Sequence, residues 1–544
     1  METPSTTSRV AELVATQWPY IATTLLACAA AWVFQVLLKQ TPASKIPFIG
    51  LEIGDVDKRR LAYMQSSKQL YLDGYRKASS QTVLDKFTRG RARANVHDVQ
   101  FKKGVFRITT TKSYDVIVVD PRFLSELKDL PDDTVSFAAS VDETMHAKYT
   151  NVRADRPIIP HVVKRDLTPA LNRLNPVIAE EVDQCFQEEL PPCKDFTPVN
   201  INNKLLRIVA KVSGRIFIGP ELCRSEEYIE AAINYTLDVM GAQRAVSELK
   251  PWQRIFKAAS LSAVKNLQQR EATAMNFMRP IIEQRQRLER EDPDYQKPDD
   301  LLQWLLDDGQ NKFGQQGGHE LASIQLGLTF AAIHTTTMTA TNAFYSAAAM
   351  PEIIPELREE IREVLREHGT FTTQALQKMK KLDSFLRETM RYYPLSWTSF
   401  SRKVLKTFTL SNGQVIPAGC SIEVPAYGLA MDGEFVEEPD KFDAFRSYRA
   451  RAQEGLDGAG KAGAAAANQF VTVSPTNLTF GYGRHACPGR FFAANEIKMI
   501  VSRALLDYDI MMIDGSRERY PNLQFMTQNI PDVSKELLFK RVTI

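Results

Sequence analysis

Hydrophobic residues along most of this chain recur every three to four positions, the spacing of helices rather than the alternation of strands. The longest such run extends from about Glu320 to Met350 and ends before Pro351. A helix of that length would measure about 45 Å. Because the run is too apolar for a surface helix, we expect it to cross the centre of a large domain.

One stretch breaks the helical pattern. Residues 402–425 are more extended, and within them FTLSNGQVIPAG places β-forming residues around an Asn-Gly turn, which is typical of a hairpin. After Leu51 there is no internal repeat and no clear interdomain linker. The expected fold class is therefore mainly α (α+β): one large helical domain with small β-sheets.

The N-terminus departs from this pattern in a different way. Residues 18–38, WPYIATTLLACAAAWVFQVLL, include no charged residue, and as a helix they would span about 31 Å, the thickness of a bilayer core. Basic residues follow this run, whereas only Arg9 precedes it, so the remainder of the chain is predicted to face the cytosol. A cleaved signal peptide is the alternative, and Glu2 and Glu12 count against it.

The predicted organisation therefore has four parts. A tail over residues 1–17 precedes a transmembrane helix over 18–38, a proline-containing linker covers 39–50, and the folded domain covers 51–544. An anchor of this polarity places the protein in the endoplasmic reticulum membrane as a single-pass protein.

Composition excludes several classes of function. Lys and Arg exceed Asp and Glu by 68 − 65 = +3, so no bulk charge indicates a nucleic-acid partner. The six cysteines are sparse and form no CxxC pair, which argues against a disulfide framework or a zinc site. A glycine-rich segment over 455–467 only partly matches phosphate-binding loops, because no strand precedes it and Ala462 replaces the required Ser or Thr. We therefore predict a surface loop there and no nucleotide site.

Cys487 lies in an unusual setting, FGYGRHACPGR over 480–490. The glycines allow the backbone to turn sharply and to approach a flat group closely. A helical pattern begins just after the cysteine, and the positive end of a helix favours a thiolate. A buried structural cysteine is the ordinary reading of a single Cys. Here the surrounding pattern favours a metal ligand, and the segment resembles the haem loop of the cytochrome P450 family.

Three further segments resemble this family in the same order along the chain. AAIHTT, over 331–336, resembles the oxygen-binding groove, with His334 in place of the usual acid. Glu388 and Arg391, followed by Arg446, resemble an ion-paired triad that holds the cysteine loop. His334 has two open readings, a proton relay or a hydrogen-bond partner inside the fold.

The resemblance implies the cytochrome P450 fold and a haem b cofactor with Cys487 as the axial metal ligand. Catalytic proton delivery is implied for Thr335 and His334, and haem contacts are implied for Phe480, Arg402, His485, His161 and Arg165. A solvated basic helix face is the alternative for the last two residues. The expected substrate-pocket residues are Phe330, Ala331, Leu395, Trp397, Phe400 and Met526.

The resemblance also implies a haem-thiolate monooxygenase that uses O₂ and electrons from NADPH. The chain resembles fungal microsomal members of the ent-kaurene oxidase type, so the expected substrate is a small lipophilic terpenoid of secondary metabolism. With no reductase domain present, the expected partner is NADPH-cytochrome P450 reductase, and cytochrome b5 is a second candidate. Arg484, Arg490 and Lys498 are candidate docking residues, with solvated charges as the alternative.

Two rivals and one surface feature stay open. A haem-thiolate isomerase or dehydratase would need no O₂, and a non-catalytic haem or sterol carrier would need no proton groove; Thr335 argues against both. The segment over 251–261, PWQRIFKAASL, mixes apolar and basic residues and is a candidate for membrane contact, with amphipathic packing as the alternative.

Overall fold

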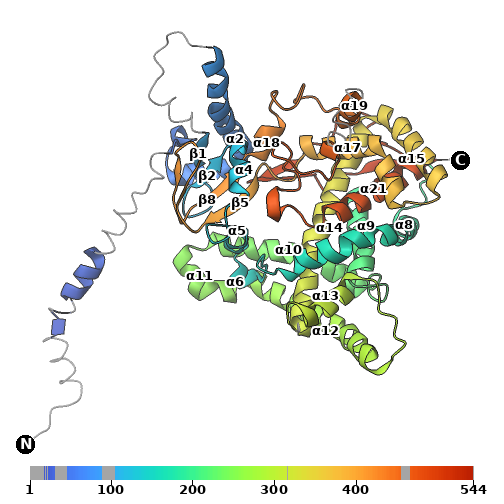
Figure 1. Cartoon of the computed structure of the whole chain (residues 1–544), viewed down its shortest axis with the longest axis horizontal. Helices are drawn as coiled ribbons and strands as arrows, with labels where there is room; N and C mark the ends of the chain where they lie inside the picture. The colour runs from blue at the N-terminus through green and yellow to red at the C-terminus, as the bar shows by residue number, and fades with distance from the viewer. Residues whose placement is uncertain are drawn as a thin grey trace, which may run out of the picture.

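The computed structural model describes residues 17–18, 20, 22–30, 46–87, 104–314, 317–454 and 466–542 (Figure 1). In this part of the chain, helices predominate and the strands form four small sheets. The expected fold class, mainly helical with small sheets, is confirmed.

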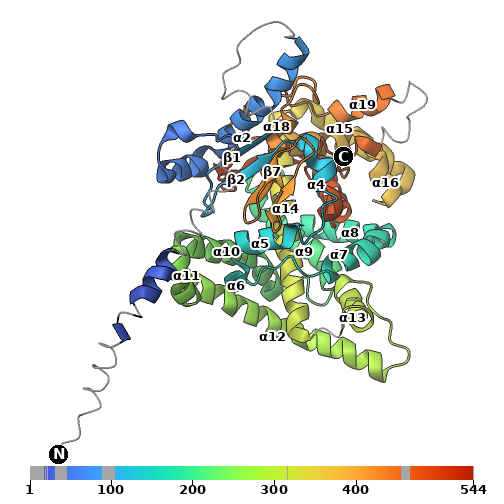
Figure 2. The ribbon, with the colours of Figure 1, turned by 60° about the vertical axis from the view of Figure 1, so that its left-hand side comes forward.

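The predicted central helix is α14 (Gly318–Ala349), which has 32 residues and so rises about 48 Å. It is buried along most of its length, and its many Ala and Thr side chains are small enough for other helices to pack closely. Four helices pack against it (Figure 1 and Figure 2): α9 (Ile201–Phe217), α10 (Glu226–Glu248), α12 (Ser262–Glu291) and α21 (Arg490–Asp507).

The other helices cover this bundle and the largest sheet. A π-helical turn over Val163–Leu167 joins α7 to α8, so that these elements run on as one long helix. Their bounds are α2 (Val56–Phe87), α4 (Leu124–Leu127), α5 (Phe137–Met145), α6 (Ala147–Thr150), α7 (Ile158–Val162), α8 (Thr168–Glu189), α11 (Pro251–Lys257), α13 (Leu301–Asn311), α15 (Ile354–His368), α16 (Thr373–Lys378), α17 (Lys380–Tyr392), α18 (Ala426–Ala430) and α19 (Arg446–Glu454).

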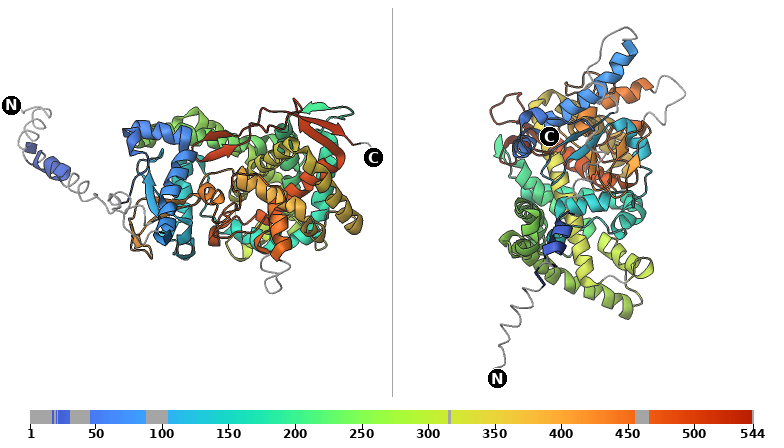
Figure 3. Two further views of the ribbon diagram at one scale, coloured as in Figure 1. Left: turned by 90° about the horizontal axis from the view of Figure 1, so that it is seen from above. Right: turned by 90° about the vertical axis from the view of Figure 1, so that its left-hand side faces the viewer.

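The largest sheet has the strand order β1-β2-β8-β5-β3, and its only parallel pair in the described chain is β2 with β8. Its strands are β1 (Val105–Ile108), β2 (Val116–Val119), β3 (Val135–Ser136), β5 (Ser399–Val404) and β8 (Ser421–Val424). At the opposite end of the molecule lies a three-stranded sheet (Figure 3) of β4 (Thr197–Val199), β12 (Leu537–Arg541) and β9 (Tyr508–Met512).

The two remaining sheets are two-stranded. The predicted hairpin is confirmed, since β6 (Phe408–Thr409) pairs antiparallel with β7 (Val415–Ile416) around the Asn-Gly turn. The second pair is β10 (Leu523–Phe525) with β11 (Gln528–Ile530), which packs against α2.

The predicted anchor is only partly within the described residues. Residues 18, 20 and 22–30 are helical, and residues 31–38, like most of the linker and the glycine-rich loop over 455–465, lie outside the described chain. Across the residues that the structure describes, no helix is both long and apolar enough to cross a bilayer.

Candidate active site

Cys487 is held by a tight loop in front of α21. Gly481 and Gly483 take φ of +75° and +72°, a conformation that side chains with a Cβ avoid, and this turns the chain back on itself. The backbone N–H of Cys487 donates to the carbonyl of Phe480 at 2.8 Å and closes the loop. Because α21 begins at Arg490, as the sequence predicts, the cysteine is fixed from both sides.

The surroundings of Cys487 suit a metal ligand. Burial raises the pKa of its thiol, while the backbone N–H groups of Gly489 and Arg490 and the charge of Arg490 oppose that shift. A thiol in this position therefore keeps its proton unless a metal ion replaces it, because a coordinated thiol is deprotonated. The loop is thus better suited to coordination than to a free nucleophilic thiolate.

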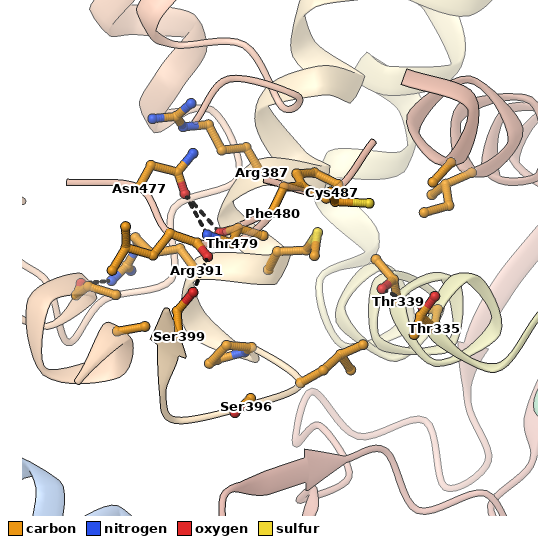
Figure 4. A pocket seen from close by; sticks show the side chains of 18 of the residues that line it. Thr335, Thr339, Arg387, Arg391, Ser396, Ser399, Asn477, Thr479, Phe480 and Cys487 are labelled. Atoms are coloured by element: carbon orange, nitrogen blue, oxygen red, sulfur yellow. Dashed lines mark hydrogen bonds between the residues drawn. The ribbon is translucent and has the colours of Figure 1, made fainter. Parts of the chain in front are cut away.

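Cys487 opens onto a cavity of about 850 Å³. Thr335 and Thr339 of α14 point into the same cavity, as Figure 4 shows. Much of the remaining wall is apolar and includes Ile159, Val163, Leu167, Phe217, Leu328 and Ile497. The cavity therefore joins the cysteine loop to the middle of the central helix within an enclosure that favours lipophilic groups.

Thr335 and His334 are neighbours on α14 but face different ways. The Thr335 hydroxyl donates to the Ala331 carbonyl at 2.7 Å, and its side chain remains exposed to the cavity. His334 Nε2 lies 2.9 Å from the carbonyl of Ile233 on α10; since a carbonyl only accepts, Nε2 carries the proton. Burial lowers the pKa of His334, which leaves its imidazole neutral at neutral pH. These contacts favour the reading of His334 as an internal hydrogen-bond partner.

The structure brings Glu388, Arg391 and Arg446 together. Glu388 accepts two hydrogen bonds from Arg391, both at 2.8 Å, and one from Arg446 at 3.4 Å. Arg391 also donates to the carbonyls of Ala430 and Pro439, each at 2.9 Å. The Glu388 side chain is only 3% exposed, so it depends on both arginines for compensation of its charge.

Arg402 and His485 converge on one ring. The Arg402 guanidinium lies 5.2 Å from the Phe137 ring centroid, and the His485 ring lies 5.3 Å from it. Arg402 is 5% exposed, and burial lowers its pKa to about 10. His485 Nε2 is 3.1 Å from a carboxylate oxygen of Asp132, and burial lowers the pKa of this imidazole.

The surroundings of Arg402 indicate whether the site suits haem. Its guanidinium remains charged at neutral pH, yet no carboxylate oxygen of the described residues lies within 4.0 Å of it. A buried cation without a carboxylate partner is costly. The carboxylate groups of a porphyrin would supply the missing partner through charge-assisted hydrogen bonds. The donor set and the cavity beside Cys487 therefore fit this cofactor.

Of the expected haem contacts, Phe480 lies in the cavity wall, and its ring packs edge-on to Phe470 at 5.6 Å. Arg402 and His485 are not among the described residues that line the cavity. His161 and Arg165 do not line the cavity; Arg165 Nη1 lies 3.3 Å from His161 Nε2, and Arg165 Nε lies 3.1 Å from Asp166. Other residues of that helix occupy the wall instead, so this pair lies on a different face.

Of the expected pocket residues, Ala331 and Leu395 line the cavity. The other four are not among the residues that line it: Trp397 and Phe400 are buried in the core, and Phe330 and Met526 are partly buried and pack against it. Trp397, for example, is 2% exposed and packs on Tyr427 at 4.8 Å. Strand β5 has a register irregularity between Ser399 and Arg402, and Phe400 takes φ of +55°. Its ring lies in the core of the large sheet, as the alternating burial of the strand requires.

One of the residues expected to dock a redox partner is not available for that role. Lys498 is 6% exposed, and its ammonium lies 2.5 Å from Asp383, so it is not on the surface. Arg484, by contrast, keeps 43% of its side chain exposed and pairs with Asp132.

Thr339 lines the cavity although it is not among the residues predicted from the sequence. Its i+4 spacing from Thr335, which places both side chains on one face of the helix, was the available signal.

A half-buried cysteine at the start of a helix, facing a threonine groove across a largely apolar cavity, defines the haem-thiolate class of protein. The family profile for cytochrome P450 matches residues 134–534. The chain belongs to the cytochrome P450 family and is a monooxygenase. Its cofactor is haem b, with the Cys487 thiolate as the axial ligand.

Similar proteins agree with this assignment. The cytochrome P450 monooxygenase ATR3 of Stachybotrys chlorohalonatus is 39% identical over 428 residues, covering 78% of this chain and 89% of that protein. The cytochrome P450 monooxygenase paxP of Penicillium paxilli is 35% identical over 446 residues, with coverage of 81% and 84%. The structure of retinoic acid-bound cyanobacterial CYP120A1 superposes with a TM-score of 0.61 at 18% identity, covering 81% of this chain and 92% of that one, and so shares the fold.

Proposed function

We propose that this protein is a membrane-anchored monooxygenase that oxidises a small lipophilic terpenoid of fungal secondary metabolism. The observation that carries the proposal is the cavity itself, with Cys487 on one wall, Thr335 on the other and mostly apolar side chains between them. Such a lining selects a ligand by burying its apolar surface, and a few hydroxyl groups can orient it. Its similarity to fungal monooxygenases supports the reaction class.

When haem is bound, it supplies the activation of O₂, from which one oxygen atom enters the substrate and the other leaves as water. The protein's own residues position the substrate and deliver protons. The Thr335 hydroxyl is held by the Ala331 carbonyl at 2.7 Å and can rotate to present its proton to the cavity. Thr339 lies one turn further along α14 and lines the same wall. The apolar side chains around these hydroxyls limit the access of water to them.

We infer that electrons come from NADPH through a separate NADPH-cytochrome P450 reductase, with cytochrome b5 as a second donor. Members of this family generally depend on a redox partner. Lys164 and Arg484, on the side of the cysteine loop, lie close enough for the Lys164 ammonium to reach the Arg484 carbonyl at 3.5 Å. Their positive charge suits an acidic partner surface.

We also propose attachment to the endoplasmic reticulum membrane at two places, the predicted anchor over 18–38 and helix α11. Three side chains of α11 are strongly exposed although apolar: Trp252 at 62%, Ile255 at 70% and Phe256 at 79%. Basic residues Arg254 and Lys257 stand among them. This combination is typical of a helix that lies in the membrane interface, with the catalytic domain in the cytosol.

The proposal is tested by expressing the full chain with a reductase in yeast and feeding candidate diterpenes. The expected products are heavier than the substrate by oxygen and appear only when NADPH and O₂ are present, as measured by mass spectrometry. A rearranged product without O₂ would identify an isomerase instead. A haem-loaded protein that converts no diterpene would refute a diterpene substrate while leaving the reaction class intact.

A further inference from the structure

Asp383 on α17 is a buried carboxylate that the reaction described above does not use. Its side chain is 7% exposed and has three donors: the ammonium of Lys498 at 2.5 Å, the guanidinium of Arg451, and the backbone N–H of Phe470 at 2.9 Å. Burial alone would raise the pKa of Asp383, but Lys498 and Arg451 outweigh it and hold the pKa below its ordinary value. The carboxylate therefore stays ionised inside the fold.

Through Phe470, Asp383 contacts the chain that enters the cysteine loop. Phe470 is 1% exposed, and its ring packs edge-on against Phe480 at 5.6 Å. The Phe480 carbonyl in turn accepts the hydrogen bond from the N–H of Cys487. Phe470, which is bound to Asp383, is thus connected to Cys487 through a single residue, Phe480.

Through Lys498, Asp383 contacts the chain that leaves the cysteine loop. Lys498 lies on α21, the helix that begins directly after the loop, and it also donates to the Leu376 carbonyl at 3.0 Å. A shift of α21 would therefore move the C-terminal end of the loop. Asp383 is in contact with both flanks of Cys487.

Neighbouring charges hold the same entering segment. Arg387, one turn after Asp383 on α17, donates to the carbonyls of Ala467 and Gln469 at 3.2 and 2.6 Å. Arg451 donates to the Asn468 carbonyl at 3.1 Å through Nε. Charged side chains rather than strand pairing therefore position residues 467–470.

We propose that Asp383 is a positioning residue for Cys487, which clamps the two segments flanking the cysteine and so sets the direction of its sulfur toward haem. This clamp is separate from the triad around Glu388, because the triad holds a different segment of the chain. Glu388 accepts from the backbone N–H of Asp443, and Arg391 and Arg446 donate to backbone carbonyls between residues 430 and 441. The clamp accounts for the burial of Lys498, which pairs with Asp383 instead of meeting a redox partner.

The test is Asp383→Asn in the full haem-loaded protein. Asn keeps the size and still accepts from the Phe470 N–H, but it removes the charge that Lys498 and Arg451 require. We expect the ratio of thiolate-ligated to non-thiolate protein, read from the carbon monoxide difference spectrum, to fall on the order of tenfold. The reduction potential of the haem should also shift, and Asp383→Glu should restore both values toward those of the wild type.

Asp300→Asn is the matched control. Asp300 is also buried and accepts two hydrogen bonds from the buried Arg285, both at 2.7 Å, but it touches neither flank of the cysteine loop. The Asp300→Asn protein should lose thermal stability without a change in its carbon monoxide difference spectrum. If Asp383→Asn does not accumulate, Lys498→Met decides by the same spectrum, with the same direction expected.

The inference is overturned if a haem-loaded Asp383→Asn protein has the wild-type spectrum and potential. It is equally overturned if Asp300→Asn changes both readouts as much as Asp383→Asn does, because a general loss of stability would then suffice. Neither measurement requires a substrate, so the outcome is independent of the proposed terpenoid specificity.

Discussion

Replacing Glu496 by Gln should make the protein more stable at neutral pH. Glu496 lies on α21 and has no exposed surface. The Ser213 hydroxyl donates to its Oε1 at 2.8 Å, while Oε2 has no hydrogen-bond partner among the described residues. Burial raises the pKa of this carboxyl from 4.5 to about 8, so that it is protonated at pH 7 in the folded protein.

The sign of the pH dependence follows from this raised pKa. As pH rises above 4.5, the unfolded chain releases the proton that the folded chain retains, so the contribution to stability is full below 4.5 and is lost up to about pH 8. At pH 7 the loss is about 1.36 × (7 − 4.5), or about 3 kcal/mol. Gln does not ionise, but its buried amide costs about 1 kcal/mol, which leaves a gain of about 2 kcal/mol.

This gain can be converted into a melting temperature. An unfolding entropy of about 2.1 cal/mol/K per residue gives about 1.1 kcal/mol/K for 544 residues, so the midpoint should rise by about 2 °C at pH 7. The assay is thermal unfolding of the haem-loaded protein between about pH 5 and pH 8, with the exposed Glu536→Gln as control. The reasoning is refuted if the difference between Glu496→Gln and wild type is the same at every pH.

Three other changes test the site and the membrane contact. Thr335→Ala should lower product formed per NADPH consumed on the order of tenfold or more, while Thr335→Ser retains coupling; equal coupling in both would remove the proton-delivery role. His334→Leu should cost about 1 kcal/mol of stability by losing the Ile233 contact, and His334→Gln should couple normally; strong uncoupling by the stable Gln variant would instead indicate a relay. If α11 lies in the membrane interface, brominated lipids should quench the emission of Trp252, so the Trp252→Phe protein should be quenched less than the control, Trp304→Phe. Equal quenching of the two proteins would contradict interfacial binding by α11.

Local signals explain what the sequence predicts well. The central helix ends where Pro351 follows, the hairpin has an Asn-Gly turn, and α21 begins after the glycines of the cysteine loop. Each of these features depends on residues a few positions apart, so periodicity and turn chemistry are sufficient to find it.

Features that depend on distant segments could not be predicted in this way. Lys498 has an ordinary charged position in the sequence, and only Asp383 on α17 explains its burial. In the same way, burial alternates along β5, but only the sheet that packs there shows that the Phe400 ring lies in the core and not in the cavity wall. The direction of His334 likewise depends on a carbonyl of α10, which no motif of α14 specifies.

The charges around the cavity relate the cofactor to the stability of the fold. Burial lowers the pKa of both Arg387 and Arg402 to about 10, so both remain positive at neutral pH, and no described carboxylate oxygen lies within 4.0 Å of either guanidinium. When bound, haem would supply negative charge through its carboxylates, for which Arg402 is a candidate partner, and through the thiolate that it stabilises. Because the folded chain binds haem and the unfolded chain lacks this arrangement, loading with haem must stabilise the fold as well as complete the active site.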